Sequence, residues 1–158
     1  MILLTIVHAV VLLLTESLRL DNNKFTGQIP RQFGDVTDLI DLTLNNNEFE
    51  GSIPDLFINL KDLTFLRLQN NEITGSIPSE LGYCHKLREL YLENNKMTGS
   101  VPSELKTLLQ LRKFRLQKNQ FTGEVPQDVC DLISDEALEF VGADCESGGI
   151  QCNCCKCY

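Results

Sequence analysis

The chain has 158 residues, a net charge of −8, 7% aromatic residues and no tryptophan. This length is typical of one domain. The acidic balance argues against nucleic acid as a partner, because no basic stripe is present to neutralise phosphates.

Residues 1–14 are an apolar leader in which Thr5 and His8 are the only polar side chains. The leader is shorter than the roughly 20 residues that a membrane-spanning helix needs, so no stable transmembrane span is expected. Its length fits a signal-peptide core, but no Lys or Arg precedes the apolar run and no small-x-small cleavage site follows it. The leader is therefore a signal-like segment, an apolar plug over the first coil, or a start inside a longer gene.

Residues 15–130 contain five copies of a 24-residue frame in unbroken register, the clearest of which is Leu87–Pro102. Its leucines follow the pattern Leu-x-x-Leu-x-Leu, in which the last two alternate with polar residues as in a strand with one buried face. A repeat of this kind buries its apolar side only against neighbouring copies. The predicted fold is therefore an α/β solenoid: a right-handed leucine-rich-repeat arc with a concave parallel sheet and short helical or 3₁₀ turns on the convex side.

Three further columns recur in every copy and have structural explanations. An asparagine amide at the turn out of each strand can satisfy backbone groups in its own coil and the adjoining one. The glycine stands where the turn needs a backbone without a Cβ. The proline, with its fixed φ and no N–H, suits the start of the convex segment. The columns are Asn23, Asn47, Asn71, Asn95 and Asn119; Gly27, Gly51, Gly75, Gly99 and Gly123; and Pro30, Pro54, Pro78, Pro102 and Pro126.

The motif Asn-x-Phe/Ile/Met-Thr/Glu-Gly-x-Ile/Val-Pro resembles the plant-type extracellular repeat of receptor-like kinases, receptor-like proteins and polygalacturonase-inhibiting proteins. The cysteine pattern after residue 129 resembles the carboxyl-terminal cap of algal, particularly diatom, proteins of this class. The resemblance implies a recognition module and says little about its ligand.

On the predicted sheet, the residues between the leucines point into the concave face. The centre of that face combines two aromatic rings with charged side chains, which is typical of an interaction hot spot. In the alternative interpretation, pairs such as Arg67 with Glu89 only stabilise the sheet. The candidate binding residues are Phe65, Arg67, Glu89, Tyr91, Lys113 and Arg115.

Residues 131–158 are expected to form a cysteine-rich cap over the last coil, with a short helix over Asp131–Val141 and Ser134 as its N-cap. Six cysteines are candidates for disulfides: Cys130, Cys145, Cys152, Cys154, Cys155 and Cys157. The simplest pairing sends Cys130 and Cys145 into the final cluster, whose remaining two cysteines pair locally. The alternative is a thiolate metal site. Cys84 occupies a core position and is expected to be an inert buried thiol.

Disulfides in the cap would place the protein in an oxidising compartment, which is secreted, cell-surface or lumenal, and an extracellular or cell-surface location is predicted. Neither histidine stands near an evident nucleophile or base, so no catalysis, cofactor or metal is expected. The predicted function is a non-catalytic recognition module that binds a protein, peptide or polysaccharide partner through its concave face. The alternative is a structural or truncated ectodomain fragment of a membrane receptor-like protein, with no ligand of its own.

Overall fold

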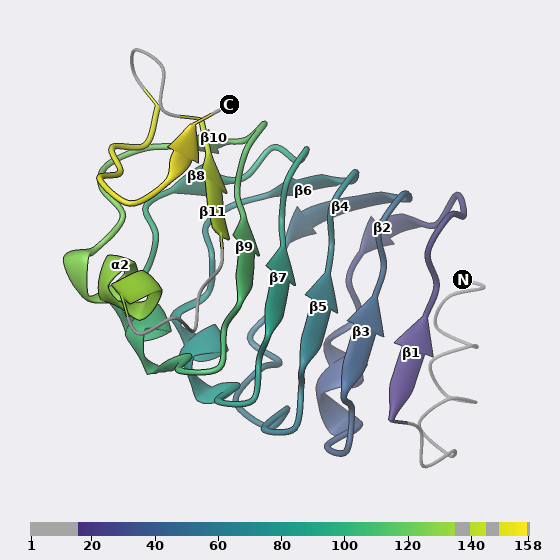
Figure 1. The fold of residues 1–158 in the computed structure, drawn as a ribbon. Coiled ribbons are helices and arrows are strands. Elements are labelled where there is room, and N and C mark those ends of the chain that lie inside the picture. Colours follow the sequence, from purple (N-terminus) through teal and green to yellow (C-terminus); the bar gives the residue numbers. More distant parts are fainter. Residues whose placement is uncertain (1–15, 135–139, 145–148, 158) are drawn as a thin grey trace.

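The computed structural model describes residues 16–134, 140–144 and 149–157, which form a stack of coils with a parallel sheet along one side (Figure 1). The predicted leucine-rich-repeat solenoid is confirmed. Each coil contributes one short strand to the concave sheet, and two strands from the carboxyl-terminal segment extend it. In spatial order the strands are β1 (Ser17–Arg19), β3 (Asp41–Thr43), β5 (Phe65–Arg67), β7 (Glu89–Tyr91), β9 (Lys113–Arg115), β11 (Phe140–Ala143) and β12 (Lys156–Cys157).

The register of this sheet follows the repeat without a slip. Leu42 pairs with Leu66, Leu66 with Leu90, and Leu90 with Phe114, so the buried residue of each strand stacks on the next. Since side chains alternate along a strand, the two residues that flank each buried one lie in columns on the opposite, concave side.

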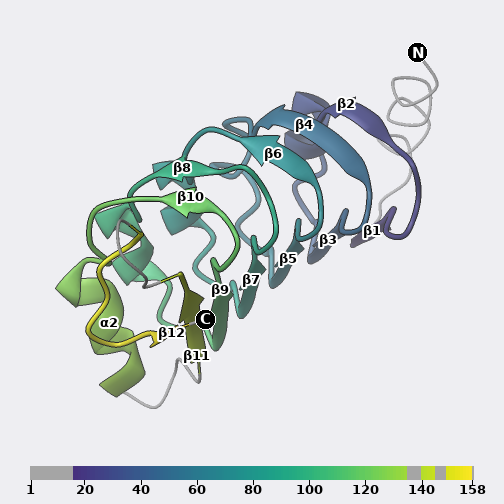
Figure 2. The ribbon, with the colours of Figure 1, turned by 90° about the horizontal axis from the view of Figure 1, so that it is seen from above.

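The coils turn back through a second set of short strands, seen from above in Figure 2. Gly99 has φ +81° and Gly27 has φ +82°, in the left-handed region that L side chains rarely adopt, which explains the glycine column. The strands are β2 (Thr26–Gln28), β4 (Glu48–Ser52) and β6 (Glu72–Thr74) in one sheet, and β8 (Thr98–Gly99) and β10 (Gln120–Phe121) in another.

Short 3₁₀ helices begin directly after three of the five prolines, as the sequence predicts: η1 (Arg31–Asp35), η2 (Ser79–Tyr83) and η3 (Ser103–Thr107). The second coil has an irregular turn after Pro54, and the fifth has the α-helix α2 (Gln127–Ser134) after Pro126. Proline fits the position before each turn because its φ is fixed and its missing N–H is not needed there.

One continuous apolar core runs through the stack, from Leu18 in the first coil to Leu132 in α2. The convex segments contribute two buried columns, as predicted. The first is Phe33, Phe57, Leu81, Leu105 and Val129, and the second is Val36, Leu60, Cys84, Leu108 and Leu132. Cys84 is fully buried and reduced, and burial raises the pKa of its thiol to about 12, which makes it inert at neutral pH.

The asparagine column closes each coil against the preceding one. Asn95 Nδ2 donates to the carbonyl oxygens of Leu92 and Leu68, each at 3.0 Å, and its Oδ1 accepts the backbone N–H of Ile73 at 3.0 Å. One amide thus satisfies main-chain groups of two coils that would otherwise be buried without partners. The predicted structural role of this column is confirmed.

The carboxyl-terminal segment differs from the expected cap. The predicted helix over Asp131–Val141 is wrong: α2 begins at Gln127 and ends at Ser134, and Val141 lies in β11. The physical reason is the open edge of β9, whose backbone groups β11 pairs in parallel. The predicted boundary between the repeats (15–130) and the cap (131–158) falls inside α2. This boundary therefore stays a prediction from the 24-residue period.

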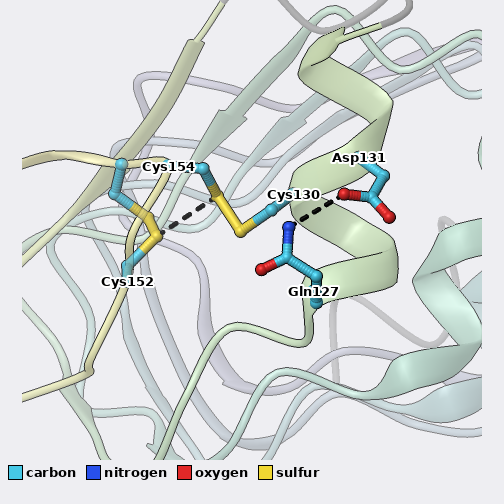
Figure 3. Close-up of a disulfide and its surroundings, with 6 residues drawn as sticks. Gln127, Cys130, Asp131, Cys152 and Cys154 are labelled. Atoms are coloured by element: carbon cyan, nitrogen blue, oxygen red, sulfur yellow. Dashed lines mark hydrogen bonds between the residues drawn. A yellow bond between two sulfur atoms is a disulfide. The ribbon is translucent and has the colours of Figure 1, made fainter.

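Two disulfides lie near the carboxyl terminus, and one of them joins this segment to the last coil (Figure 3). Cys130, on α2, is bonded to Cys154, and Cys152 is bonded to Cys155. The sulfur atoms of Cys130, Cys152 and Cys154 lie within 4.8 Å of one another, a spacing that a metal site would also need. In this structure they are disulfide sulfurs, which offer no thiolate to a metal. Cys145 and the side chain of Cys157 lie outside the described residues.

Residues 1–15, and with them the predicted leader, also lie outside the described residues. Among the helices that the structure describes, none is both long and apolar enough to cross a membrane.

Candidate binding face

Three neighbouring strands bring the six predicted binding residues together on one side of the concave sheet. Parallel pairing sets Phe65 beside Glu89 and Glu89 beside Lys113 in one column, and Arg67 beside Tyr91 and Tyr91 beside Arg115 in the next. All six are half-buried. We call this set, Phe65, Arg67, Glu89, Tyr91, Lys113 and Arg115, the central concave face.

Aromatic rings and guanidinium groups are stacked across the central concave face. The Cζ atom of Arg67 lies 4.8 Å from the ring centroid of Phe65 and 5.9 Å from that of Tyr91. On the other side of Tyr91, the Cζ atom of Arg115 lies 4.8 Å from the centroid of the Tyr91 ring. These distances are within the range of cation–π attraction. The stack fixes the orientation of four side chains before any partner arrives, which lowers the entropy that binding would lose.

Glu89 connects the two columns electrostatically. Its Oε2 accepts from Arg67 Nη2 at 2.6 Å, and its Oε1 lies 3.3 Å from Lys113 Nζ. Burial alone raises the pKa of this carboxyl, but the hydrogen bonds and charges of Arg67 and Lys113 outweigh burial and hold its pKa below the ordinary value of 4.5. Glu89 is therefore ionised at neutral pH and fixes both cations.

Glu93 has the opposite electrostatic balance. It lies just after β7, where Arg115 Nη1 is 3.6 Å from its Oε1. Burial raises the pKa of the Glu93 carboxyl, and a backbone hydrogen bond and the charge of Arg115 compensate only in part. Glu93, at the edge of the central concave face where the strands end (its upper edge), thus carries a carboxylate whose charged form is poorly stabilised.

The second coil does not continue the central concave face in an accessible form. Asp41 and Thr43 occupy the same columns but are 4% and 6% exposed. Asp41 accepts from Arg19 Nη2 at 2.6 Å and from the Thr43 hydroxyl at 2.6 Å, and its second cation, Arg67 Nη1, is 3.6 Å away. These groups satisfy one another, so the buried second coil separates the central concave face from the exposed Ser17 and Arg19 of the first coil.

Two arginines beside this face were missed by the sequence prediction. A depression of about 320 Å³ at the start of the strands is lined by Phe65, Glu89 and Lys113 and also by Arg88 and Arg112. The alternation rule selects only the two positions that flank the central buried residue of each strand, and both arginines stand one residue before their strands. The available signal was compositional, because the column reads Glu16, Ile40, Thr64, Arg88, Arg112 and becomes basic only in the last two coils.

The described residues show no grouping of a nucleophile with a base. The thiol of Cys84 is buried, and His85 lies in a convex groove between η2 and η3, beside Tyr83 and Glu104. No hydrogen bond joins the His85 side chain to a described hydroxyl, thiol or carboxylate. The concave arrangement can hold charged and aromatic groups of a partner, which is chemistry of recognition.

Comparison with known sequences identifies the repeats. A family model described as "Leucine rich repeat" matches residues 15–73, and one described as "Leucine Rich repeats (2 copies)" matches residues 61–107. Among curated protein sequences, none matches this chain significantly.

Solved structures with the same fold include ectodomains of plant membrane receptor kinases from Arabidopsis thaliana. The leucine-rich-repeat ectodomain of GASSHO1/SCHENGEN3, solved in complex with CASPARIAN STRIP INTEGRITY FACTOR 2, is 38% identical with a TM-score of 0.71 over 74% of this chain and 14% of its own. HAESA, solved with the peptide hormone IDA and the co-receptor SERK1, is 35% identical with a TM-score of 0.76 over 82% of this chain and 21% of its own. The ectodomain of SOBIR1 is 28% identical with a TM-score of 0.72 over 85% of this chain and 68% of its own.

This chain therefore spans only 14% of the first of these ectodomains and 21% of the second. The repeats and the close structural similarity to plant receptor-kinase ectodomains agree with the resemblance drawn from the sequence. No comparison addresses the algal type of cysteine cap.

Proposed function

Because this chain is a leucine-rich-repeat solenoid similar to the ectodomains of plant receptor kinases, we propose that it is a non-catalytic recognition module. It works outside the cell or at the cell surface and binds its partner through the central concave face. The observation that carries this proposal is the stack of Phe65, Arg67, Tyr91 and Arg115 across three neighbouring coils. Aromatic and arginine side chains held in fixed positions are the groups that dominate binding energy at protein interfaces.

The partner class that the comparisons favour is a peptide. HAESA was solved with a peptide hormone, and a further neighbour, RGFR1, is described as a plant peptide hormone receptor in complex with RGF2. A narrow row of half-buried positions across strands spaced about 4.8 Å apart suits an extended chain. The two disulfides near the carboxyl terminus support an oxidising, extracellular setting.

The test is binding by a variant in which Phe65, Arg67 and Tyr91 are all changed to alanine. The probes are short random peptides on phage and an array of neutral and acidic polysaccharides. We expect the wild-type protein to select binders and the triple variant to lose them, with its thermal unfolding still cooperative.

A matched control changes Tyr83, Lys106 and Leu109 to alanine. These residues offer an aromatic, a cationic and an apolar side chain on the convex side, where Tyr83 is 52% and Leu109 is 68% exposed. The control should bind like the wild type. Binders that survive the concave variant, or that are lost in the convex one, would overturn the concave-face proposal and favour a structural segment without a ligand on this face.

A further inference from the structure

The depression beside the central concave face has a strongly cationic wall. It holds about 320 Å³ and is lined by Phe65, Arg88, Glu89, Arg112 and Lys113. Its described lining residues include three cationic side chains and one carboxylate, a net charge of +2, in a protein whose overall charge is −8. The local sign is therefore opposite to that of the molecule, which attracts anions to this place.

Arg88 and Arg112 are fixed side by side. The backbone N–H of Arg112 donates to the carbonyl oxygen of Arg88 at 2.8 Å, which sets the two residues in register on adjacent coils. Both side chains are exposed. Within residues 16–134, 140–144 and 149–157, neither guanidinium group has a hydrogen-bond or ion-pair partner.

Two like charges held side by side repel each other, and an anion placed between them reduces this repulsion. The rest of the concave sheet avoids this arrangement, because Arg19, Arg67 and Arg115 each lie against a carboxylate. The only carboxylate among the described lining residues, Glu89, is already engaged by Arg67 and Lys113. Among the described residues no carboxylate compensates Arg88 and Arg112, so their charge is available to an anionic group.

We propose that this depression binds the side-chain carboxylate of an acidic residue in a peptide partner. A guanidinium group offers a planar fork that matches a carboxylate with two parallel hydrogen bonds, and a second guanidinium adds charge from the adjacent coil. Phe65 forms the apolar wall of the same depression and accepts an apolar side chain next to the acid. This inference rests on the proposed function and names one element of the partner.

The charge pattern favours a peptide with one acid over a polyanionic polysaccharide. A polyuronate carries a carboxylate on every sugar, and along this face it would meet Glu89 in the depression and Glu93 at the upper edge. Like charges at these positions oppose such a chain. A peptide can place one acid at the arginines and neutral or basic residues elsewhere.

The test uses the full chain and short random peptides displayed on phage. We expect wild-type protein to select peptides that share one Asp or Glu next to an apolar residue. For a synthetic copy of a selected peptide, the double variant R88Q/R112Q should raise the Kd at least about tenfold. Changing the peptide's acid to its amide should cause a similar loss with wild-type protein and little further loss with the double variant.

The matched control is K24Q/R31Q, which removes two exposed positive charges from the first coil and changes the net charge equally. It should leave the Kd within about twofold. Peptides that bind the wild type and R88Q/R112Q equally would overturn the acid site while leaving the concave-face function intact. Selection of an oligouronate in place of peptides would overturn the peptide assignment, and binding insensitive to Phe65, Arg67 and Tyr91 would overturn the proposed function itself.

Discussion

Two sets of columns repeat along this solenoid, and they hold their side chains in different ways. In the turn column each coil has the same residue, asparagine, and every amide from Asn47 to Asn119 bonds main-chain groups of its own coil and the preceding one. In the concave columns the residue changes from coil to coil, and the side chains contact one another. The uniform column closes the coil, whereas the variable columns can change chemistry without opening it.

Energetics explain why one column is constant and the other is not. A buried main-chain group without a partner costs about 1–3 kcal/mol, so each turn asparagine is hard to replace. A half-exposed ion pair contributes about 0–1 kcal/mol, so a concave residue is easily exchanged. The four predictions below test this difference, beginning with the largest expected effect.

The first prediction concerns Asn95, which is 9% exposed. Changing it to alanine leaves the N–H of Ile73 and the carbonyls of Leu68 and Leu92 without their amide partner. We expect the free energy of unfolding to fall by about 3 kcal/mol, measured by urea denaturation.

The adjacent Asn94 is the matched control. Its side chain is exposed and donates to Asn70 Oδ1 at 2.7 Å, and its φ is 59°. Asn94→Gly removes this exposed bond but relieves the left-handed backbone, so we expect a change below about 1 kcal/mol. Equal losses in Asn94→Gly and Asn95→Ala would contradict the role assigned to the turn column.

The second prediction concerns the glycine column. Gly99→Ala forces a Cβ onto a residue with φ +81° and places it 3.2 Å from Ser76 Cβ. We expect a loss of about 1–2 kcal/mol in the same urea measurement. Gly27→Ala is the control for the steric part, since its φ is +82° but nothing lies within 4 Å of an added Cβ. A smaller loss at Gly27 would separate the two causes, and no loss at either would refute the backbone argument.

Columns that have the same type of residue in each coil make a fold predictable from one sequence. The leucines of residues 15–130 repeat because neighbouring coils must pack on one another, and the asparagines, glycines and prolines repeat because main-chain geometry demands them. The period therefore predicted the concave sheet, its register and three of the five convex turns. The helix in the cap was misplaced because no repeat constrains that segment. Its structure depends on the edge that β9 leaves open, which is a tertiary requirement.

The concave columns were predictable in position but not in chemistry. Alternation placed Phe65, Arg67 and Tyr91 on one face, and the strand register bears this out. It could not show that Asp41 and Thr43 are buried and hydrogen-bonded to Arg19 and Arg67, because these contacts come from neighbouring coils. Arg88 and Arg112 were missed because they precede the alternating positions. Whether these residues bind a partner stays a prediction.

The third prediction tests the concave columns directly. Arg67→Ala removes two cation–π contacts and the ion pair with Glu89, yet Lys113 still neutralises Glu89 and Arg19 still neutralises Asp41. We therefore expect a loss of no more than about 1 kcal/mol in urea denaturation, although binding of a selected peptide should be lost. A loss as large as that of Asn95→Ala would place Arg67 among the structural residues and favour the interpretation in which the face only stabilises the sheet.

The fourth and smallest effect comes from two carboxyls whose pKa values move in opposite directions. The pKa of Glu89 is lowered from 4.5, so its charge stabilises the fold at neutral pH, and this contribution is lost as the pH falls through the lowered value. The pKa of Glu93 is raised from 4.5 by burial, so its charge destabilises the fold at neutral pH, and this penalty disappears as the pH falls through the raised value toward 4.5.

At pH 7 we expect Glu89→Gln to lower the free energy of unfolding and Glu93→Gln to leave it unchanged or raise it, each by less than about 1 kcal/mol. Urea denaturation of both variants at neutral pH and at a pH below the lowered pKa of Glu89 measures this. The difference between the variants should shrink at the lower pH because both carboxyls are then largely protonated. If both variants are destabilised equally at every pH, the two glutamates act through hydrogen bonding alone. The charge of Glu93 would then impose no cost on the folded face, and the electrostatic contrast between the middle of the face and its upper edge would be wrong.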